Sequence, residues 1–188
     1  MVLDGFTRAL DGFEAALAGV APSRWSSPSP CAAWSAADVA GHVIAGLRGT
    51  EVLARGRYED YEEPEHPGSA IGDDPLAAWR LARADMMAAL DSSALARLVP
   101  GPWGPMPLGE ILERSPMEFL VHTWDVAQAT GQAAVLDPGL VRDALQPARQ
   151  FALLARGSGL IGPECAVPED ADDLTRLLAI FGRRNTGS

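Results

Sequence analysis

Between Ser35 and Arg55 the sequence reads SAADVAGHVIAGLRGTEVLAR, and this stretch indicates a helix packed inside a larger structure. Ser35 followed by Asp38 resembles a capping box, with Asp in place of the usual Glu or Gln. Apolar residues continue on both sides of His42, and Gly56 follows as a stop signal. We therefore predict a helix from Ser35 to about Arg55 with a histidine in its middle.

Segments on either side of this helix show the same helical period. Apolar residues recur at spacings of three and four, and Pro, Gly or polar clusters bound each run. The further helices that we predict cover residues 3–17, 74–90, 108–130, 137–156 and 171–181. Pro116 lies inside 108–130, so we expect a kink or a local start near Ser115. The Pro-rich run 98–107 cannot be a helix and should form a strand-like excursion or a short hairpin.

The composition favours a mainly α fold, in one domain over residues 1–188. The chain has 188 residues, of which 47% are apolar, and this is enough for a sizeable core. Aromatic residues make up only 6%, so Ala and Leu must supply most of the packing, and both favour helices. The last residues, about 182–188, are polar, and we expect a frayed tail there.

The charge of the chain argues against nucleic-acid binding. Lys and Arg number 15 against 25 Asp and Glu, which gives a formal net charge of −10, and no basic run is present. Acidic residues gather between Glu59 and Asp74 without the glycine spacing of a calcium loop, which indicates a solvated loop. Charges at Asp4, Arg8 and Asp11 argue against a signal peptide or a membrane span, so we expect a cytoplasmic protein.

A pair of residues on the predicted 108–130 helix has the spacing of metal ligands. His122 lies four residues after Glu118, so the two side chains share one helix face, one turn apart. Asp125 continues that face and is a candidate to orient His122. His42, on another helix, would add a third ligand. Zinc, nickel and iron(II) all accept imidazole and carboxylate, and three protein ligands leave positions for water or substrate.

Each of these histidines also has an ordinary structural interpretation. The Glu-x-x-x-His spacing is common, and a histidine among apolar residues is usually a core side chain bonded to a carbonyl. Three small residues follow His42 on one face, namely Ala45, Gly46 and Gly49. Either they admit a closely packed helix or they leave a cavity beside the histidine. Spacing alone does not decide between a metal site and a core.

Other reactive side chains have weaker indications. Cys31 and Cys165 form no C-x-x-C pattern, and a disulfide between them stays open. We interpret Cys31 as a small buried anchor before Trp34 rather than as a ligand or a nucleophile. Trp103, in the Pro-rich run, should lie at a pocket mouth. His66 lies in the acidic loop and should be solvated.

Two arginines near the end of the chain are candidates for cofactor binding. Arg176 and Arg183 could clamp a carboxylate, although an arginine near a helix end more commonly interacts with the helix dipole. No phosphate-binding loop, nucleotide fingerprint or serine elbow is present in the sequence. The functional hypothesis therefore centres on the histidines.

Two longer motifs, and a third near the end of the chain, resemble those of a known family. Residues 30–43, PCAAWSAADVAGHV, look like the signature P-C-x-x-W-[ST]-x-x-[DE]-[LV]-x-x-H. Residues 118–131, EFLVHTWDVAQATG, resemble E-[LF]-x-x-H-x-W-D-[LV]-A-x-A-[ST]-G, and residues 173–183, DLTRLLAIFGR, are similar to D-R-L-L-A-x-x-G-R. These signatures are those of the DinB/YfiT-like metalloproteins, and specifically of the mycothiol-dependent maleylpyruvate isomerase-type branch in its short, single-domain members.

The resemblance carries expectations about fold and site. It implies an all-α, DinB-like four-helix bundle with a short Pro-rich excursion and a C-terminal helix. It also implies a divalent metal, with zinc preferred over nickel or iron, held by His42, Glu118 and His122. The main DinB branch has a histidine where Glu118 stands, so this chain resembles the Glu-bearing, isomerase-type branch.

The resemblance further implies a thiol-dependent transferase or isomerase that acts on a small electrophilic molecule with mycothiol as co-substrate. The chain departs from the isomerase itself by ending soon after the bundle, without a further C-terminal domain. A non-catalytic metal- or ligand-binding helical module and a metal-dependent hydrolase stay open as alternatives. The expected partners are a small-molecule substrate and a low-molecular-weight thiol, with no nucleic acid or membrane, and a homodimer is compatible with the sequence.

Overall fold

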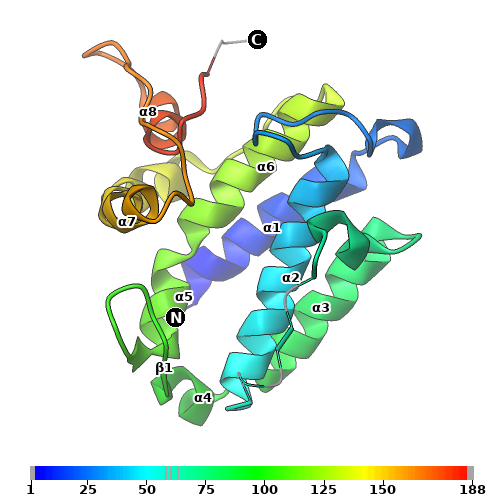
Figure 1. Cartoon of the computed structure of the whole chain (residues 1–188), viewed down its shortest axis with the longest axis vertical. Coiled ribbons are helices and arrows are strands. Elements are labelled where there is room, and N and C mark those ends of the chain that lie inside the picture. Colours follow the sequence, from blue (N-terminus) through cyan, green and yellow to red (C-terminus); the bar gives the residue numbers. More distant parts are fainter. Residues whose placement is uncertain (1–2, 58, 60, 63, 186–188) are drawn as a thin grey trace.

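The computed structural model describes residues 3–57, 59, 61–62 and 64–185, which form a mainly helical fold (Figure 1). Its longer helices are α1 (Asp4–Ala18), α2 (Ala36–Ala54), α3 (Pro75–Ala89), α6 (Pro116–Thr130), α7 (Pro138–Gly157) and α8 (Asp173–Ile180). Its shorter elements are the 3-10 helices η1 (Pro22–Arg24) and η3 (Pro67–Ile71), the helices α4 (Ser92–Ala96) and α5 (Leu108–Arg114), and the strands β1 (Leu98–Val99) and β2 (Met106–Pro107). The prediction of an all-α fold with a Pro-rich excursion and a C-terminal helix is confirmed.

Four helices, α1, α2, α3 and α6, form the bundle. The contacts run from α1 to α6, from α6 to α2, from α2 to α3 and from α3 back to α1, so each helix packs against two others. A second layer consists of α7 and α8, which pack on each other and on α6 (Figure 1). This arrangement is the DinB-like helical bundle that the resemblance implied.

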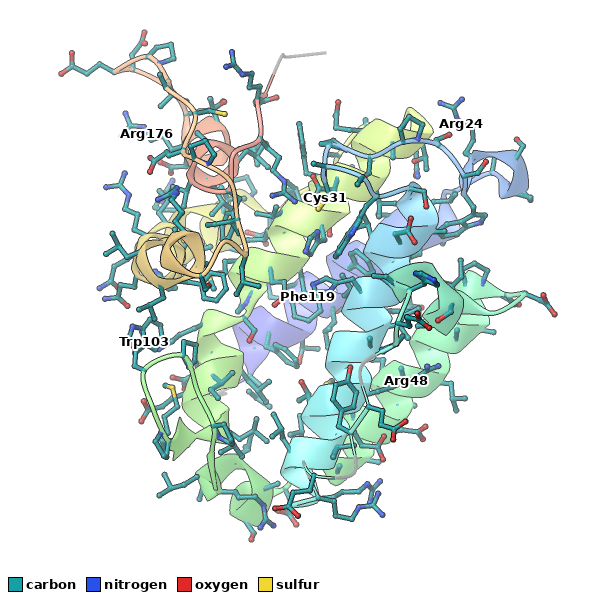
Figure 2. All side chains as sticks on the ribbon, viewed as in Figure 1. Arg24, Cys31, Arg48, Trp103, Phe119 and Arg176 are labelled. Atoms are coloured by element: carbon teal, nitrogen blue, oxygen red, sulfur yellow. The ribbon has the colours of Figure 1, made fainter. Side chains whose placement is uncertain are left out.

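Aromatic side chains join three of the bundle helices in the core. Phe119 of α6 lies near the centre of the fold (Figure 2) and packs edge-on against Phe6 of α1, with ring centroids 5.5 Å apart. Trp79 of α3 is fully buried and lies 4.9 Å from the Phe13 ring of α1. Leu and Ala fill most of the remaining core, as the low aromatic content required.

The capping box predicted at the start of α2 is present. The Ser35 hydroxyl accepts the Asp38 N–H at 3.2 Å, and Asp38 Oδ2 accepts the Ser35 N–H at 2.9 Å. The other carboxylate oxygen of Asp38 accepts the Gly68 N–H at 3.1 Å, which ties η3 to the N-terminal turn of α2. One aspartate therefore stabilises both the helix start and the segment that packs against it. The pKa of Asp38 lies below its ordinary value, chiefly because of the hydrogen bonds from Ser35.

The strip of small residues after His42 leaves a cavity. Tyr61 lies over Gly49 and donates its hydroxyl hydrogen to the Ala45 carbonyl at 3.0 Å, and a hollow of about 310 Å³ lined by these residues lies beside His42. The close approach occurs instead at Gly41, where an added Cβ would lie 1.9 Å from the Pro67 carbonyl oxygen. Gly41 is thus the residue that admits η3 to the surface of α2.

Two short helices were not predicted from the sequence, whereas one expected helix start is confirmed. The first is α4, which follows the end of α3 and starts where the Asp91 side chain accepts the Ala94 N–H. Part of the expected acidic loop forms η3, and Asp60 and Glu63 of that loop lie outside the described residues. The local start expected near Ser115 is present, because residues 108–130 form two helices, α5 and α6, which separate where Pro116 has no N–H for the helical ladder.

The other boundaries agree with the sequence within a few residues. Strands β1 and β2 pair antiparallel, so the Pro-rich run forms the short hairpin that was one of its two predicted states. Of the predicted frayed tail, 186–188 lie outside the described residues, whereas the Arg183 side chain is only 10% exposed and is bound to α6. No helix within the described residues is long and apolar enough to cross a membrane.

Substitutions at two glycines of α2 should change stability in opposite directions. Gly41→Ala should lower the free energy of unfolding by at least about 1–3 kcal/mol, because its methyl group collides with the backbone of η3. Gly46→Ala has no atom within 4 Å of its new methyl group and should raise that free energy by about 0.5–1 kcal/mol. Urea denaturation of both variants checks this, and equal effects would contradict the close contact between α2 and η3.

Candidate metal centre

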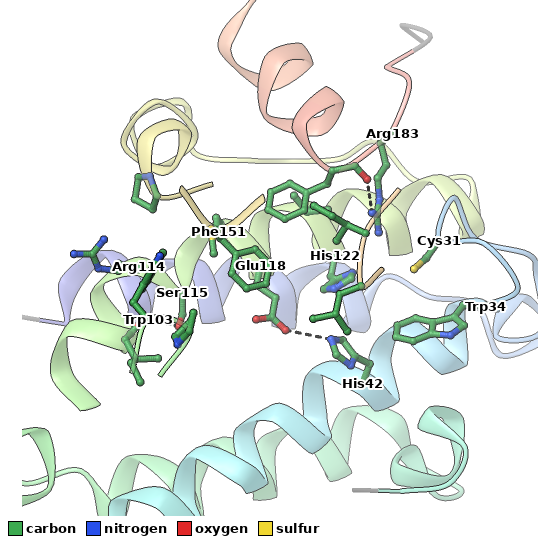
Figure 3. Close-up of a pocket in the computed structure, with 18 of the residues that line it drawn as sticks. Cys31, Trp34, His42, Trp103, Arg114, Ser115, Glu118, His122, Phe151 and Arg183 are labelled. Atoms are coloured by element: carbon green, nitrogen blue, oxygen red, sulfur yellow. Dashed lines mark hydrogen bonds and ion pairs between the residues drawn. The ribbon is translucent and has the colours of Figure 1, made fainter. Parts of the chain in front are cut away.

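The face of α6 that carries Glu118 and His122 lies opposite the middle of α2. Since the two residues are four apart, their side chains lie one turn apart on this face. His42 of α2 points toward them across the gap (Figure 3), with its Nε2 atom 3.2 Å from Oε1 of Glu118. The imidazole rings of His42 and His122 lie 5.2 Å apart, at 75° to each other. The structure thus brings together all three residues that the sequence singled out.

The donor atoms of this triad fit a divalent cation. One ligand atom from each residue lies within 4.8 Å of the others. Around a tetrahedral zinc ion with ligand distances near 2.1 Å, two donor atoms lie about 3.4 Å apart, so the 3.2 Å separation of His42 and Glu118 already fits. Two imidazole nitrogens and one carboxylate oxygen suit zinc, nickel and iron(II) and occupy only part of the coordination shell.

The orientation of His122 is set by a buried carboxylate. Asp125 is fully buried, and its Oδ2 lies 3.0 Å from Nδ1 of His122. Because an ionised carboxylate only accepts hydrogen bonds, Nδ1 carries the hydrogen and Nε2 keeps its lone pair. The expected contact between Asp125 and His122 is therefore present, and it favours the tautomer that a metal at Nε2 requires.

Arg183 completes this arrangement from the end of the chain. Its Nη2 donates to Oδ2 of Asp125 at 2.7 Å and its Nε donates to Oδ1 at 3.2 Å, which makes a bidentate pair. The segment after α8 is thereby bound to α6. Arg183 thus contacts the histidine's carboxylate partner, although the sequence suggested that it binds a cofactor.

The carboxylates of the centre are ionised at neutral pH. Burial opposes the charge of Asp125, but hydrogen bonds from His122 and Arg183 outweigh it, so the pKa of Asp125 lies below its ordinary value. Desolvation likewise opposes ionisation of Glu118, yet the hydrogen bond from His42 and the two histidines' charges bring its pKa below the usual range.

The triad opens into a cavity of about 570 Å³, a size typical of small-molecule sites. Trp34 forms one wall and lies 5.0 Å from the His42 ring. Met117 and Val121 of α6 and Phe151 of α7 also line it, together with Ile161 of the segment after α7. The walls are mainly apolar, and the Glu118 side chain is 46% exposed, so a small molecule can reach the triad from solvent.

The remaining sequence candidates separate into those at the cavity and those away from it. Trp103 lines the cavity and is 48% exposed, as expected at a mouth. Cys31 also lines it as a free thiol, and its pKa is raised because burial outweighs the nearby Arg183. Arg176 lies out on α8 (Figure 2), where it donates to the carbonyls of Ala171 and Glu169, and it does not line the cavity.

Two further residues are outside the centre. His66 is exposed in the loop before η3, as predicted, and is not part of the triad. Cys165 is a free thiol, so the alternative of a disulfide with Cys31 is not realised. Sequence reasoning missed Arg114 and Ser115, which line the cavity just before α6. Arg114 precedes Glu118 by four residues, a spacing that would have placed it near the triad on a continuous helix. The helix break at Ser115 interrupts that spacing.

Comparison with known proteins assigns the family. The sequence model described as "Mycothiol maleylpyruvate isomerase N-terminal domain" matches residues 6–127. The chain belongs to this family. The matched region contains His42, Glu118, His122 and Asp125, whereas Arg183 lies beyond it. The prediction of a DinB/YfiT-like member of the isomerase-type branch is confirmed.

Relatives extend the likeness to almost the whole chain. Two proteins, each named as uncharacterized, from two strains of Mycobacterium tuberculosis are each 32% identical to this chain over 182 residues. The alignment covers 94% of this chain and 94% of each relative. No solved structure matches the chain.

The role of Arg183 can be tested on stability. Arg183→Met leaves the buried Asp125 without its guanidinium partner and should lower the free energy of unfolding by about 3 kcal/mol. Arg184→Met, at the exposed neighbouring arginine, should change it by less than about 0.5 kcal/mol. Urea denaturation of the two variants measures both values. A similar loss in both would mean that the ion pair of Arg183 and Asp125 adds nothing to the free energy of unfolding.

Proposed function

We propose that this protein binds one divalent metal ion, zinc in the first place, through His42, Glu118 and His122. We propose further that it uses this ion to join a low-molecular-weight thiol of the mycothiol type to a small electrophile, as a transferase or isomerase. The observation that carries the proposal is the convergence of three donor atoms from α2 and α6, within 4.8 Å of one another, on the wall of a cavity. Membership of a family described by a mycothiol-dependent isomerase supports the thiol.

Zinc at this position would lower the pKa of a coordinated thiol, so that a thiolate nucleophile exists near neutral pH. The protein's own residues prepare the place for it. Asp125 holds His122 in one tautomer and one orientation. Glu118 lies in the first turn of α6, where the helix dipole favours its negative charge. The apolar walls of the cavity suit the apolar part of an electrophile.

The proposed reaction fits a reducing compartment. Low-molecular-weight thiols keep cytosolic cysteines reduced, and both cysteines of this chain are free. We therefore propose a cytoplasmic location for the protein.

Metal content tests the ligand assignment. The purified wild-type protein should contain about one equivalent of metal per chain, and the double variant His42→Ala/His122→Ala should contain almost none, because a single carboxylate holds a cation poorly. His66→Ala is the matched control, since it removes the exposed third histidine and should keep the full metal content. Elemental analysis by mass spectrometry measures all three proteins. One equivalent in the double variant would show that the ligands are misassigned.

Thiol turnover tests the reaction. The metal-loaded protein should accelerate consumption of mycothiol by a panel of small electrophiles, and the double histidine variant should reduce the rate at least about a hundredfold. His66→Ala should retain the wild-type rate. Loss of free thiol and formation of the conjugate are followed by chromatography. A fully metal-loaded protein that neither consumes thiol nor isomerises any of the electrophiles in its presence would instead favour a metal-dependent hydrolase or a binding module.

A further inference from the structure

The cavity contains a cation that the metal centre does not use. Of the two arginines that line it, Arg183 is bound to Asp125. Arg114 donates to the neutral side chain of Gln150 at 2.9 Å and stacks over the Trp103 ring at 5.4 Å. Among the described residues, no carboxylate oxygen lies within salt-bridge distance of its guanidinium. Arg114 therefore brings an uncompensated positive charge to the cavity.

This charge lies at the opposite end of the cavity from Arg183. Figure 3 shows Arg114 and Trp103 together at one end, Arg183 and Cys31 at the other, and Glu118 and the two histidines between them. Arg114 and Trp103 also line a second hollow of about 500 Å³ on the outer side, formed with α7. The guanidinium thus lies at the junction between the inner cavity and the surface.

Apolar surface surrounds the same junction. Ile111, Phe151 and Ile161 line the inner cavity. Three large apolar side chains of the two linings are exposed: Trp103, which lines both hollows, at 48%, Leu153 of the outer hollow at 76% and Leu160 of the inner cavity at 74%. An exposed apolar cluster at a cavity mouth is typical of a ligand-binding surface.

A single cation in apolar surroundings favours one class of ligand. A guanidinium binds carboxylate, sulfonate or phosphate oxygens through paired hydrogen bonds, and these are stronger where water is scarce. The protein's net charge of −10 repels anions in general, so an anion subsite needs a local cation of this kind. The apolar walls require that the rest of the ligand be apolar.

We propose that Arg114 binds the anionic group of an apolar-bodied small molecule, whose body lies along Trp103 and Phe151 toward the metal triad. Gln150 holds the guanidinium in place for this contact, and Trp103 covers its face. As a statement about the electrophilic substrate, this inference rests on the proposed function. As a statement about binding, it requires neither metal nor thiol.

The test uses 8-anilinonaphthalene-1-sulfonate, a fluorescent aromatic anion, titrated into the purified protein. Arg114→Gln should raise the dissociation constant of the dye at least about tenfold, because the charge-assisted hydrogen bonds are lost. Arg114→Lys keeps the charge but loses the planar, paired N–H donors of the guanidinium, so it should have an intermediate effect. Arg149→Gln removes the same charge from an exposed position of α7 outside the cavity and should leave the constant within about twofold.

Competition separates the anionic group from the apolar body. The concentration that displaces half of the dye from the wild-type protein should be at least about tenfold lower for decanoate than for decanol. This preference should disappear in Arg114→Gln. Circular dichroism and the urea midpoint identify any variant that binds dye because it is unfolded. If Arg114→Gln is such a variant, the dissociation constant of Arg114→Lys tests the proposal in its place. Equal dye binding by Arg114→Gln and Arg149→Gln, or equal displacement by decanoate and decanol, would overturn the proposal.

The same titration on the double variant His42→Ala/His122→Ala separates this inference from the proposed function. In this background Arg114→Gln should again raise the dissociation constant of the dye at least about tenfold, because the Arg114 end of the cavity is unchanged. A failure of the metal assignment would appear in the elemental analysis and leave the dye result intact. Equal dye binding by the well-folded double variant with and without Arg114→Gln would place the anion elsewhere and contradict the role of Arg114.

Discussion

A carboxylate buried as completely as Asp125 must have partners for its charge, and much of the structure around the cavity follows from that requirement. Its two partners come from different places. His122 is on the same helix, one turn earlier, and Arg183 is 58 residues further along the chain. The charge of one side chain thus couples the orientation of a histidine to the docking of the C-terminal segment. Without that segment the cavity would lose Phe181 and Arg183 from its wall.

The break between α5 and α6 positions the other side of the site. Pro116 starts a new helix, so Glu118 lies in a first turn and not in the middle of a longer helix. There its carboxylate benefits from the positive end of the helix dipole while it faces His42. The preceding helix, α5, ends with Arg114 at the cavity wall. A proline that interrupts helical hydrogen bonding therefore sets the positions of an acidic and a basic side chain.

The sequence predicted the elements whose signals are local. The capping box at Ser35 and Asp38 marked the start of α2, and the four-residue spacing of Glu118 and His122 placed them on one face. The sequence did not predict the shortest elements, because a helix such as α4 has only five residues and cannot display a helical period. Pro67 and Gly68 looked like loop residues, and the contact at Gly41 that orders them as η3 is a tertiary one.

The candidate site shows the same limit of sequence-based prediction, because its residues meet only through tertiary contacts. His42 was a candidate third ligand from the residues alone, but only the resemblance to the DinB/YfiT-like motifs tied it to the pair on α6, since no spacing relates residues on separate helices. Arg183 was singled out as a cofactor ligand, and only the fold shows that its partner is Asp125. Arg114 carried no motif at all. Its position depends on the helix break and on the packing of Trp103, neither of which a linear pattern encodes.

The two layers of the fold divide the cavity between them. The bundle contributes His42, Glu118 and His122, whereas Phe151, Ile161 and Phe181 come from the layer built by α7, α8 and the chain around them. The family match covers the bundle residues and stops at residue 127, before that layer begins. A change at Phe151 or Ile161 can therefore reshape the cavity while Arg183 keeps its pair with Asp125 and the donor atoms stay where they are. In a cavity divided in this way, the walls from the outer layer can differ between proteins that keep the same two histidines and glutamate.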